Sequence, residues 1–169
     1  DGAIWGGEVI VGGYRSFRRA AHLRYVPLAG GDASVTRTYR MALSHLRSAE
    51  VPWTTDLPAV QACPARERQV LAHQLESGLG CVPTSSMGRL FDAVSSLLGV
   101  RHVADYEAQA AIELESMART FAGAADPYAF ETHADVGPAS RIVDAGPVVR
   151  AVVADLRMGL DRAHIAARF

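Results

Sequence analysis

The twenty residues from Cys81 to Val100 constrain the fold most, because they predict a helix together with both of its ends. Apolar residues recur there at the spacing of one helix face: Leu90, Val94, Leu97 and Leu98. Ser85 or Ser86 is suited to cap the N-terminus, since a serine oxygen accepts a hydrogen bond from the free N–H groups of a first helical turn. Gly99 is suited to end the helix. The stretch therefore predicts a polar turn that leads into an amphipathic helix with one buried face.

The other side of this predicted helix is polar. Ser85, Arg89, Asp92 and Ser96 follow one another at intervals of three or four residues, so their side chains point the same way. One interpretation is a solvated face with an ion pair between Arg89 and Asp92. The other is a polar edge that holds a ligand. Spacing alone leaves both interpretations open.

Composition indicates a globular domain and excludes several classes of protein. The 169 residues are 49% hydrophobic and 21% charged, with a net charge of -1, which argues against a nucleic-acid partner bound by a positive surface. Cys63 and Cys81 have no zinc-site spacing and form no disulfide framework, so we expect free, partly buried thiols. No apolar run reaches membrane-spanning length. We expect no membrane association and a cytoplasmic location.

The order of predicted elements is α/β, with extended segments first and helices after them. Residues 1–32 predict a β-hairpin or meander, with strands at 9–11 and 17–25, and a Gly-Gly-Asp loop within 27–32. Residues 33–121 predict a helical region, with helices near 35–46, 65–76, 87–98 and 107–121 and a connector at 51–64. Residues 122–169 predict a loop with short strands at 128–133 and 141–143, then a closing helix at 148–167.

Six blocks of sequence carry a resemblance to a known family. They are residues 1–8 (DGAIWGGE), 17–24 (FRRAAHLR), 26–32 (VPLAGGD), 39–43 (YRMAL), 81–100 and 106–115 (YEAQAAIELE). In this order they resemble the nickel–iron hydrogenase maturation carbamoyltransferases, the HypF-type family. The resemblance implies an internal, partial segment of the family's C-terminal Kae1/TsaD-like domain, spanning 1–169. The fold it implies is the helix-rich part of an ASKHA (actin-like, ribonuclease-H-like) Kae1-type domain.

The resemblance also implies an activity for the longer parent protein. In the family, carbamoyl adenylate is made from carbamoyl phosphate and ATP. The carbamoyl group then passes to the C-terminal cysteine thiol of a HypE-type partner, as the precursor of cyanide. A divalent metal (Fe, Zn or Mg) has its main ligands outside this chain, and Asp1 is not assigned as a ligand. We expect the isolated chain to be inactive. The alternatives are an O-carbamoyltransferase that acts on a small-molecule hydroxyl, and a non-catalytic helical fragment that only folds or binds a partner.

Asp92 is the main candidate for nucleotide binding. The stretch Phe91-Asp92-Ala93-Val94 resembles the Phe-Asp-Lys-Val segment of the threonylcarbamoyltransferases, whose aspartate accepts hydrogen bonds from ribose. A carboxylate suits vicinal hydroxyls because it offers two acceptor oxygens. Ser85, Ser86 and Arg89 would lie beside it, although the serines are equally suited to be helix caps.

Five further residues are candidates on weaker grounds. Gln109 and Glu113 lie in a block that resembles a nucleotide-contacting loop and helix, and the alternative for Glu113 is a solvated helix face. Gly30, Gly31 and Asp32 would bring backbone close to a ligand. The alternative for them is a loop glycine pair followed by a helix N-cap. No catalytic residue is assigned, and none of the six histidines matches the family's metal motif.

Overall fold

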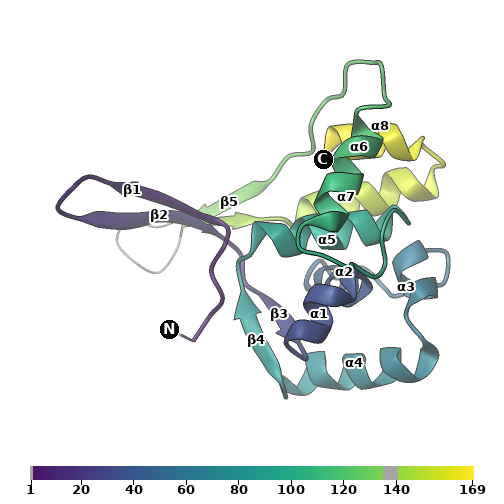
Figure 1. Ribbon diagram of the computed structural model, residues 1–169, viewed down its shortest axis with the longest axis horizontal. Coiled ribbons are helices and arrows are strands. Elements are labelled where there is room, and N and C mark those ends of the chain that lie inside the picture. Colours follow the sequence, from purple (N-terminus) through teal and green to yellow (C-terminus); the bar gives the residue numbers. More distant parts are fainter. Residues whose placement is uncertain (1, 135–140) are drawn as a thin grey trace.

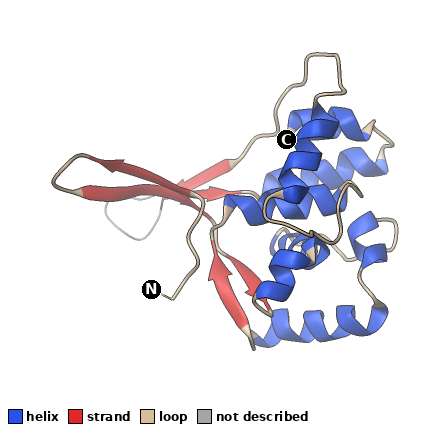
Figure 2. Cartoon of the chain, in the orientation of Figure 1, coloured by secondary structure: helices blue, strands red, loops and turns tan. Residues whose placement is uncertain are grey.

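The computed structural model describes residues 2–134 and 141–169 of the chain. A long β-ribbon projects from a body of packed helices (Figure 1). Strands and helices are segregated, with most of the strand residues on the side of the ribbon (Figure 2). The predicted α/β order, N-terminal strands followed mainly by helices, is confirmed. Asp1 and residues 135–140 of the predicted loop lie outside the described residues.

The larger sheet joins segments that lie far apart in the sequence. Its strands lie in the order β1-β2-β6-β5, and their bounds are β1 Glu8–Gly12, β2 Phe17–Leu23, β5 Glu131–Ala134 and β6 Arg141–Asp144. β1 and β2 form the predicted antiparallel hairpin, and β5 pairs antiparallel with β6. β2 pairs parallel with β6, with Ala21 opposite Arg141 and Leu23 opposite Val143. Segments from opposite ends of the sequence thus form one sheet.

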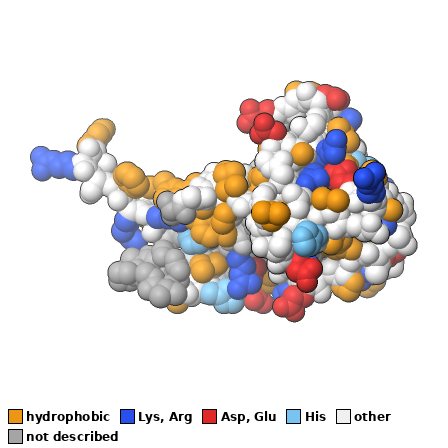
Figure 3. Space-filling model, turned by 90° about the horizontal axis from the view of Figure 1, so that it is seen from below, with side chains coloured by type: hydrophobic (Ala, Val, Ile, Leu, Met, Phe, Trp, Pro, Cys, Tyr) orange, Lys and Arg blue, Asp and Glu red, His pale blue; other side chains and the backbone are white. Residues whose placement is uncertain are grey.

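The projecting part of this sheet is apolar and exposed. Its large exposed side chains come from both strands and from the turn: Val9, Ile10, Val11, Tyr14 and Phe17. Figure 3 shows hydrophobic side chains along the ribbon, outside the helical body. β1 is an edge strand.

A second sheet replaces the first part of the loop predicted at 27–32, whereas Gly30 and Gly31 do lie outside strands and helices. β3 (Val26–Ala29) pairs antiparallel with β4 (Cys81–Thr84), which lies inside the region predicted to be helical. Pro27 stands opposite Pro83 in this register. The prediction was wrong for residues 27–29 because the pairing partner of β3 is distant in sequence, and each strand alone is too short to give a periodic pattern.

The helices predicted near 65–76, 87–98 and 107–121 are each present as one helix, whereas those predicted at 35–46 and 148–167 are each broken into two. Their bounds are α1 Asp32–Thr36, α2 Thr38–Ser48, α3 Pro58–Ala62, α4 Ala65–Ser77, α5 Met87–Leu97, α6 Gln109–Ala118, α7 Gly146–Arg157 and α8 Arg162–Arg168. The helix predicted at 35–46 is broken at Arg37, whose φ of -100° and ψ of 87° are not helical. The connector at 51–64 contains α3, which begins at Pro58. Proline suits this first position because its missing N–H would have no helical partner there.

The closing helix predicted at 148–167 is also two helices. α7 ends at Arg157, Gly159 has a φ of +75°, and the Asp161 side chain accepts a hydrogen bond from Ala163 N at the start of α8. Glycine adopts a positive φ without the steric cost that other residues meet. The break therefore follows from a helix-ending glycine and a new N-cap within a few residues.

The core surrounds α5. The predicted stripe of Leu90, Val94, Leu97 and Leu98 is fully buried, and Gly99 follows with a φ of +70°, as expected of a helix end. α5 contacts α2, α3, α6 and α7. As a result, its predicted polar side is buried as well, which makes a solvated face wrong for this helix.

Both cysteines are free, as predicted; Cys63 is buried and Cys81 is partly buried. Burial raises the pKa of the Cys63 thiol to about 11. In the described part of the chain, no helix has the length and apolar character needed to cross a lipid bilayer.

His45 is a buried polar residue of α2 beside a small cavity. The cavity has a volume of about 20 Å³ and is lined by residues of β2, β3, β4, β6, α2 and α7 and by the two serines that precede α5. His45 Nε2 is buried without a hydrogen-bond partner among the described residues. Burial lowers the pKa of His45 to about 4.

We expect His45 to make folding sensitive to acid. Its pKa is lower in the folded chain than the ordinary 6.5, so its stabilising contribution is complete above pH 6.5 and is lost as the pH falls from 6.5 towards 4. Between pH 7.5 and pH 5 this loss amounts to about 2 kcal/mol. Urea unfolding of the wild type and of His45→Gln at both pH values measures it. The difference in unfolding free energy between the two proteins changes by that amount, whereas a constant difference would contradict the assignment.

Candidate functional site

Asp92 and Arg89 form the predicted ion pair, but Asp92 is buried and the pair is not on a solvated face. Arg89 Nε and Asp92 Oδ2 are 2.9 Å apart, and the residue Asp92 is 4% exposed. The alignment is poor, so neither of these two buried atoms makes a hydrogen bond with another described residue. Burial raises the pKa of Asp92 to about 6, against the opposing effect of the Arg89 charge. A buried carboxylate with an unused acceptor oxygen is costly for stability, which is typical of functional positions.

An open depression lies next to Arg89. It has a volume of about 470 Å³, and its walls come from α1, from Arg89 on α5 and from the loop that precedes α6: Val35, Thr36, Arg89, Ala104, Asp105, Tyr106 and Glu107. Asp92 is not part of its wall. Arg89 lines the depression and pairs with Asp92, so it links the buried carboxylate to the wall of this opening.

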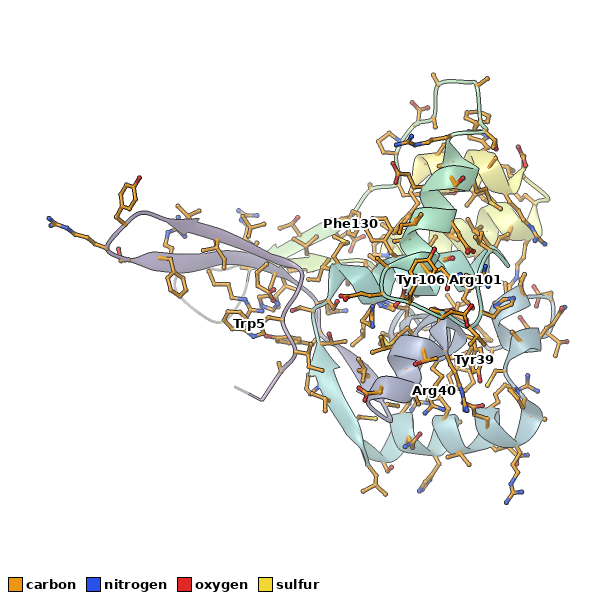
Figure 4. All side chains as sticks on the ribbon, in the orientation of Figure 1. Trp5, Tyr39, Arg40, Arg101, Tyr106 and Phe130 are labelled. Atoms are coloured by element: carbon orange, nitrogen blue, oxygen red, sulfur yellow. The ribbon has the colours of Figure 1, made fainter. Side chains whose placement is uncertain are left out.

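Gln109 and Glu113 hold the loop of this depression in place. Gln109 Oε1 accepts a hydrogen bond from Asp105 N at 2.7 Å, and Gln109 Nε2 donates to Glu113 Oε1 at 3.0 Å. Glu113 in turn accepts two hydrogen bonds from Arg101, at 2.8 and 2.5 Å, and these hydrogen bonds lower the pKa of Glu113. Figure 4 shows Arg101 and Tyr106 on the helical body. The side chains of both candidates are engaged with protein groups, and the Glu113 side chain is still 28% exposed.

The two serines have separate structural roles. Ser86 is the N-cap of α5 and accepts a hydrogen bond from Arg89 N at 3.4 Å, which confirms one of the two predicted caps. Ser85 is buried and donates to Glu8 Oε1. Both serines line the small cavity beside His45 instead of the depression beside Arg89. The structure thus does not bring them together with Arg89 around one opening.

Glu8, to which the sequence analysis assigns no role, has a side chain that is only 7% exposed. Its second oxygen accepts hydrogen bonds from Gly6 N and Gly7 N at 2.6 and 2.9 Å, and Arg19 donates to its first oxygen at 2.8 Å. Burial raises the pKa of Glu8, but the hydrogen bonds from Ser85, Gly6 and Arg19 outweigh it and the net pKa is lowered. A Cβ on Gly7 would lie 2.2 Å from the Ser85 carbonyl oxygen. The Gly-Gly-Glu motif therefore fastens the hairpin to the start of α5.

The segment of Gly30, Gly31 and Asp32 begins α1. Both glycines have positive φ, of +84° and +56°, and Gly31 is the N-cap position. A Cβ on Gly30 would lie 2.9 Å from Nη2 of Arg40. Asp32 is exposed in the first turn of α1, so it is not the N-cap itself. Of the two interpretations, the loop glycine pair is the one that the geometry shows.

Arg40 is a second buried charge that sequence reasoning missed. Its guanidinium donates to the Ala29 carbonyl at 3.0 Å and to Glu67 Oε1 at 2.5 Å. Tyr39 donates to the other oxygen of Glu67 at 2.9 Å. Each member has partners, so this group ties α2 to β3 and α4 and offers no free atom for a ligand.

The residues at the depression are suited to bind a ligand. Among residues 2–134 and 141–169, no group of three His, Cys, Asp or Glu side chains is placed to hold a metal ion. The resemblance places the main ligands of the implied metal outside this chain, and the described residues at the depression form no site for it. Arg89, Asp92 and the held loop can position a polar ligand.

The comparisons with known proteins all point to one family. The family profile described as "Carbamoyltransferase, Kae1-like Domain, second subdomain" matches residues 1–169. The carbamoyltransferase HypF of Rhodobacter capsulatus is 40% identical over 119 residues, which cover 70% of this chain and 16% of that protein. A probable carbamoyltransferase HypF of Methanocaldococcus jannaschii is 37% identical over 124 residues, covering 73% of this chain and 16% of that protein.

Two crystal structures have the same fold. One is of full-length HypF in a phosphate- and nucleotide-bound form, with a TM-score of 0.85 and 32% identity over 99% of this chain and 25% of that chain. The other is of HypF from T. kodakarensis, with a TM-score of 0.77 and 26% identity over 99% of this chain and 22% of that chain. The predicted helix-rich Kae1-type fold is therefore confirmed. The chain spans about a sixth of the curated relatives and a quarter of the first solved structure. This chain belongs to the HypF carbamoyltransferase family, as the second subdomain of its Kae1-like domain.

Proposed function

We propose that this chain supplies one wall of a nucleotide cleft in a longer, cytoplasmic, ATP-dependent carbamoyltransferase. The substrate held there is carbamoyl adenylate, formed from carbamoyl phosphate and ATP. The acceptor is the C-terminal cysteine thiol of a HypE-type partner, in the synthesis of the hydrogenase cyanide ligand. The observation that carries the proposal is the buried, incompletely bonded Asp92–Arg89 pair beside an open depression, in a chain of this family.

In this reaction, the role of this part of the protein is to hold the carbamoyl adenylate in position. The acceptor thiolate attacks the carbamoyl carbon, a C–S bond forms, and the bond from that carbon to the phosphate oxygen breaks. AMP leaves with the electron pair of that bond, so no general base within this chain is required once the thiol is ionised. Holding the adenylate still converts the encounter into an effectively unimolecular step. The relative crystallised in a nucleotide-bound form supports nucleotide binding by the parent.

Asp92 is the residue to which we assign ribose binding. Its Oδ2 lacks a hydrogen-bond donor among the described residues, and two vicinal hydroxyls would supply donors. Arg89 pairs with Asp92 and lines the depression, and the proposal requires its guanidinium to move so that a ligand in the depression reaches the carboxylate. The charge on Asp92 strengthens these hydrogen bonds relative to neutral ones.

We expect Asp92→Asn, made in the full-length parent, to weaken nucleotide binding and carbamoyl transfer. Replacing a charged acceptor costs about 1.5–3 kcal/mol, or roughly a ten- to a hundredfold loss of AMP affinity. Calorimetric titration with AMP, and transfer from carbamoyl phosphate and ATP to the acceptor cysteine, are the measurements.

Glu115→Gln is the matched control, because Glu115 is an exposed carboxylate of α6 that pairs only with Arg119 among the described residues. We expect Glu115→Gln to leave AMP affinity and carbamoyl transfer unchanged. Wild-type affinity and transfer in Asp92→Asn would remove Asp92 from the site.

We expect binding of the nucleoside to weaken in acid. Because the pKa of Asp92 is raised to about 6, most of the carboxylate is protonated at pH 5 and ionised at pH 7.5. If the ionised form accepts the ribose hydroxyls, affinity falls about tenfold between these pH values. Adenosine is the probe, since it has no phosphate that titrates in this range. Asp92→Asn removes the pH dependence, and a wild-type affinity that stays flat would contradict the assignment.

The acceptor distinguishes the proposed activity from the O-carbamoyltransferase alternative. The full-length parent with carbamoyl phosphate and ATP is offered a peptide ending in cysteine and the same peptide ending in serine. Transfer confined to the cysteine peptide supports the thiol acceptor. Transfer to hydroxyl compounds alone would favour the alternative, and transfer to neither by a parent that binds ATP would favour a non-catalytic role.

A further inference from the structure

Tyr106 is an exposed aromatic residue at the rim of the depression beside Arg89. It is 57% exposed and forms part of the wall. Among the described residues, no other aromatic ring packs against it; the ring pairs found lie elsewhere. Exposed aromatic surface at the edge of an opening is suited to stack on a planar ligand.

The loop that carries Tyr106 is held from several sides. Ala104 N donates to the Thr36 carbonyl at 2.7 Å, and Asp105 N donates to Gln109 Oε1 at 2.7 Å. Ala108, the N-cap residue of α6, has a φ of +63°, which is rare for a residue other than glycine. Such strain is retained where the surrounding contacts fix the backbone, and it concentrates at ligand-binding sites. Tyr106 is thus presented on a backbone that loses little freedom on binding.

The charges of the depression suit a nucleoside better than a phosphate chain. Arg89 is the one basic residue among the lining residues, and Asp105 and Glu107 are acidic. A phosphate group would meet a net negative wall. Hydroxyl and amino groups of a sugar or a base are donors, however, and carboxylates accept from them. The volume of about 470 Å³ is within the usual range of small-molecule sites.

We propose that Tyr106 stacks on the base of the nucleotide, so that the nucleoside end occupies this depression and the phosphates extend out of it. This orientation deepens the proposed function and rests on it. It assigns Tyr106 to binding of the base and leaves Asp92 with the ribose. Gln109 and Glu113 then act as positioning residues, because they fix the loop and do not touch the ligand.

The test compares Tyr106→Ala and Tyr106→Phe in the full-length parent. The probes are AMP and ribose 5-phosphate, which share the sugar and the phosphate but differ in the base. Loss of a base–aromatic stack lowers affinity about five- to a hundredfold, so Tyr106→Ala weakens AMP binding by that factor and leaves ribose 5-phosphate binding unchanged. Tyr106→Phe keeps AMP affinity within about threefold of the wild type, because the ring is retained.

Tyr14→Ala is the matched control. Tyr14 is a fully exposed tyrosine at the turn of the β1–β2 ribbon, and it is not among the residues that line the depression. It leaves affinity for both probes unchanged, and thermal melting confirms that each variant is folded.

The outcomes separate this inference from the proposed function. Wild-type AMP affinity in Tyr106→Ala, together with weak binding by Asp92→Asn, overturns the stacking role and keeps the nucleotide site. Equal losses for AMP and ribose 5-phosphate in Tyr106→Ala also overturn it, because the effect would not depend on the base. Wild-type affinity in both variants overturns the inference and the site together.

Discussion

The structure depends on the nearly complete burial of α5. The apolar stripe of this helix packs against its neighbours, and the opposite side is also covered, including Asp92, Ser95 and Ser96. A helix buried on all sides must satisfy its polar groups internally, because water does not reach them. Ser96 does so through the ring of His102, at 2.9 Å. Arg89 Nε and Asp92 Oδ2 have no hydrogen-bond partner among the described residues. A ligand that supplies hydrogen bonds there would offset the cost of burying these atoms.

The other buried carboxylates of this chain differ from Asp92 in their hydrogen bonds. Both carboxylate oxygens of Glu67 accept hydrogen bonds, from Tyr39 and Arg40, and Asp155 Oδ2 accepts from Tyr128 and Arg168. The pKa of Glu67 is lowered, because hydrogen bonds outweigh burial, whereas the pKa of Asp92 is raised by burial. Well-bonded buried charges fix the fold, and a buried charge with a free acceptor is available for chemistry.

Local features were predictable from the sequence, and contacts between distant segments were not. The cap at Ser86, the apolar stripe of α5 and the ion pair of Arg89 with Asp92 each follow from residues within one or two turns. The pairing of β3 with β4 and the covering of the polar side of α5 depend on segments far away in the chain. That covering changed the interpretation of Asp92 from a solvated carboxylate to a buried one. The break at Gly159 and Asp161 did have a local signal, a helix-ending glycine followed by a capping residue, which the long apolar periodicity obscured.

The parallel pairing of β2 with β6 has a consequence for how the polypeptide acquires its shape during synthesis. Within this segment, the inner strand of the ribbon is synthesised before its partner at Arg141–Val143, and the helices α1 to α6 lie between them in the sequence. Closing so long a loop has a large entropic cost before any strand contact is gained, so such sheets form slowly. Until then the apolar ribbon has an unpaired strand edge on both sides, and such edges promote association with other chains.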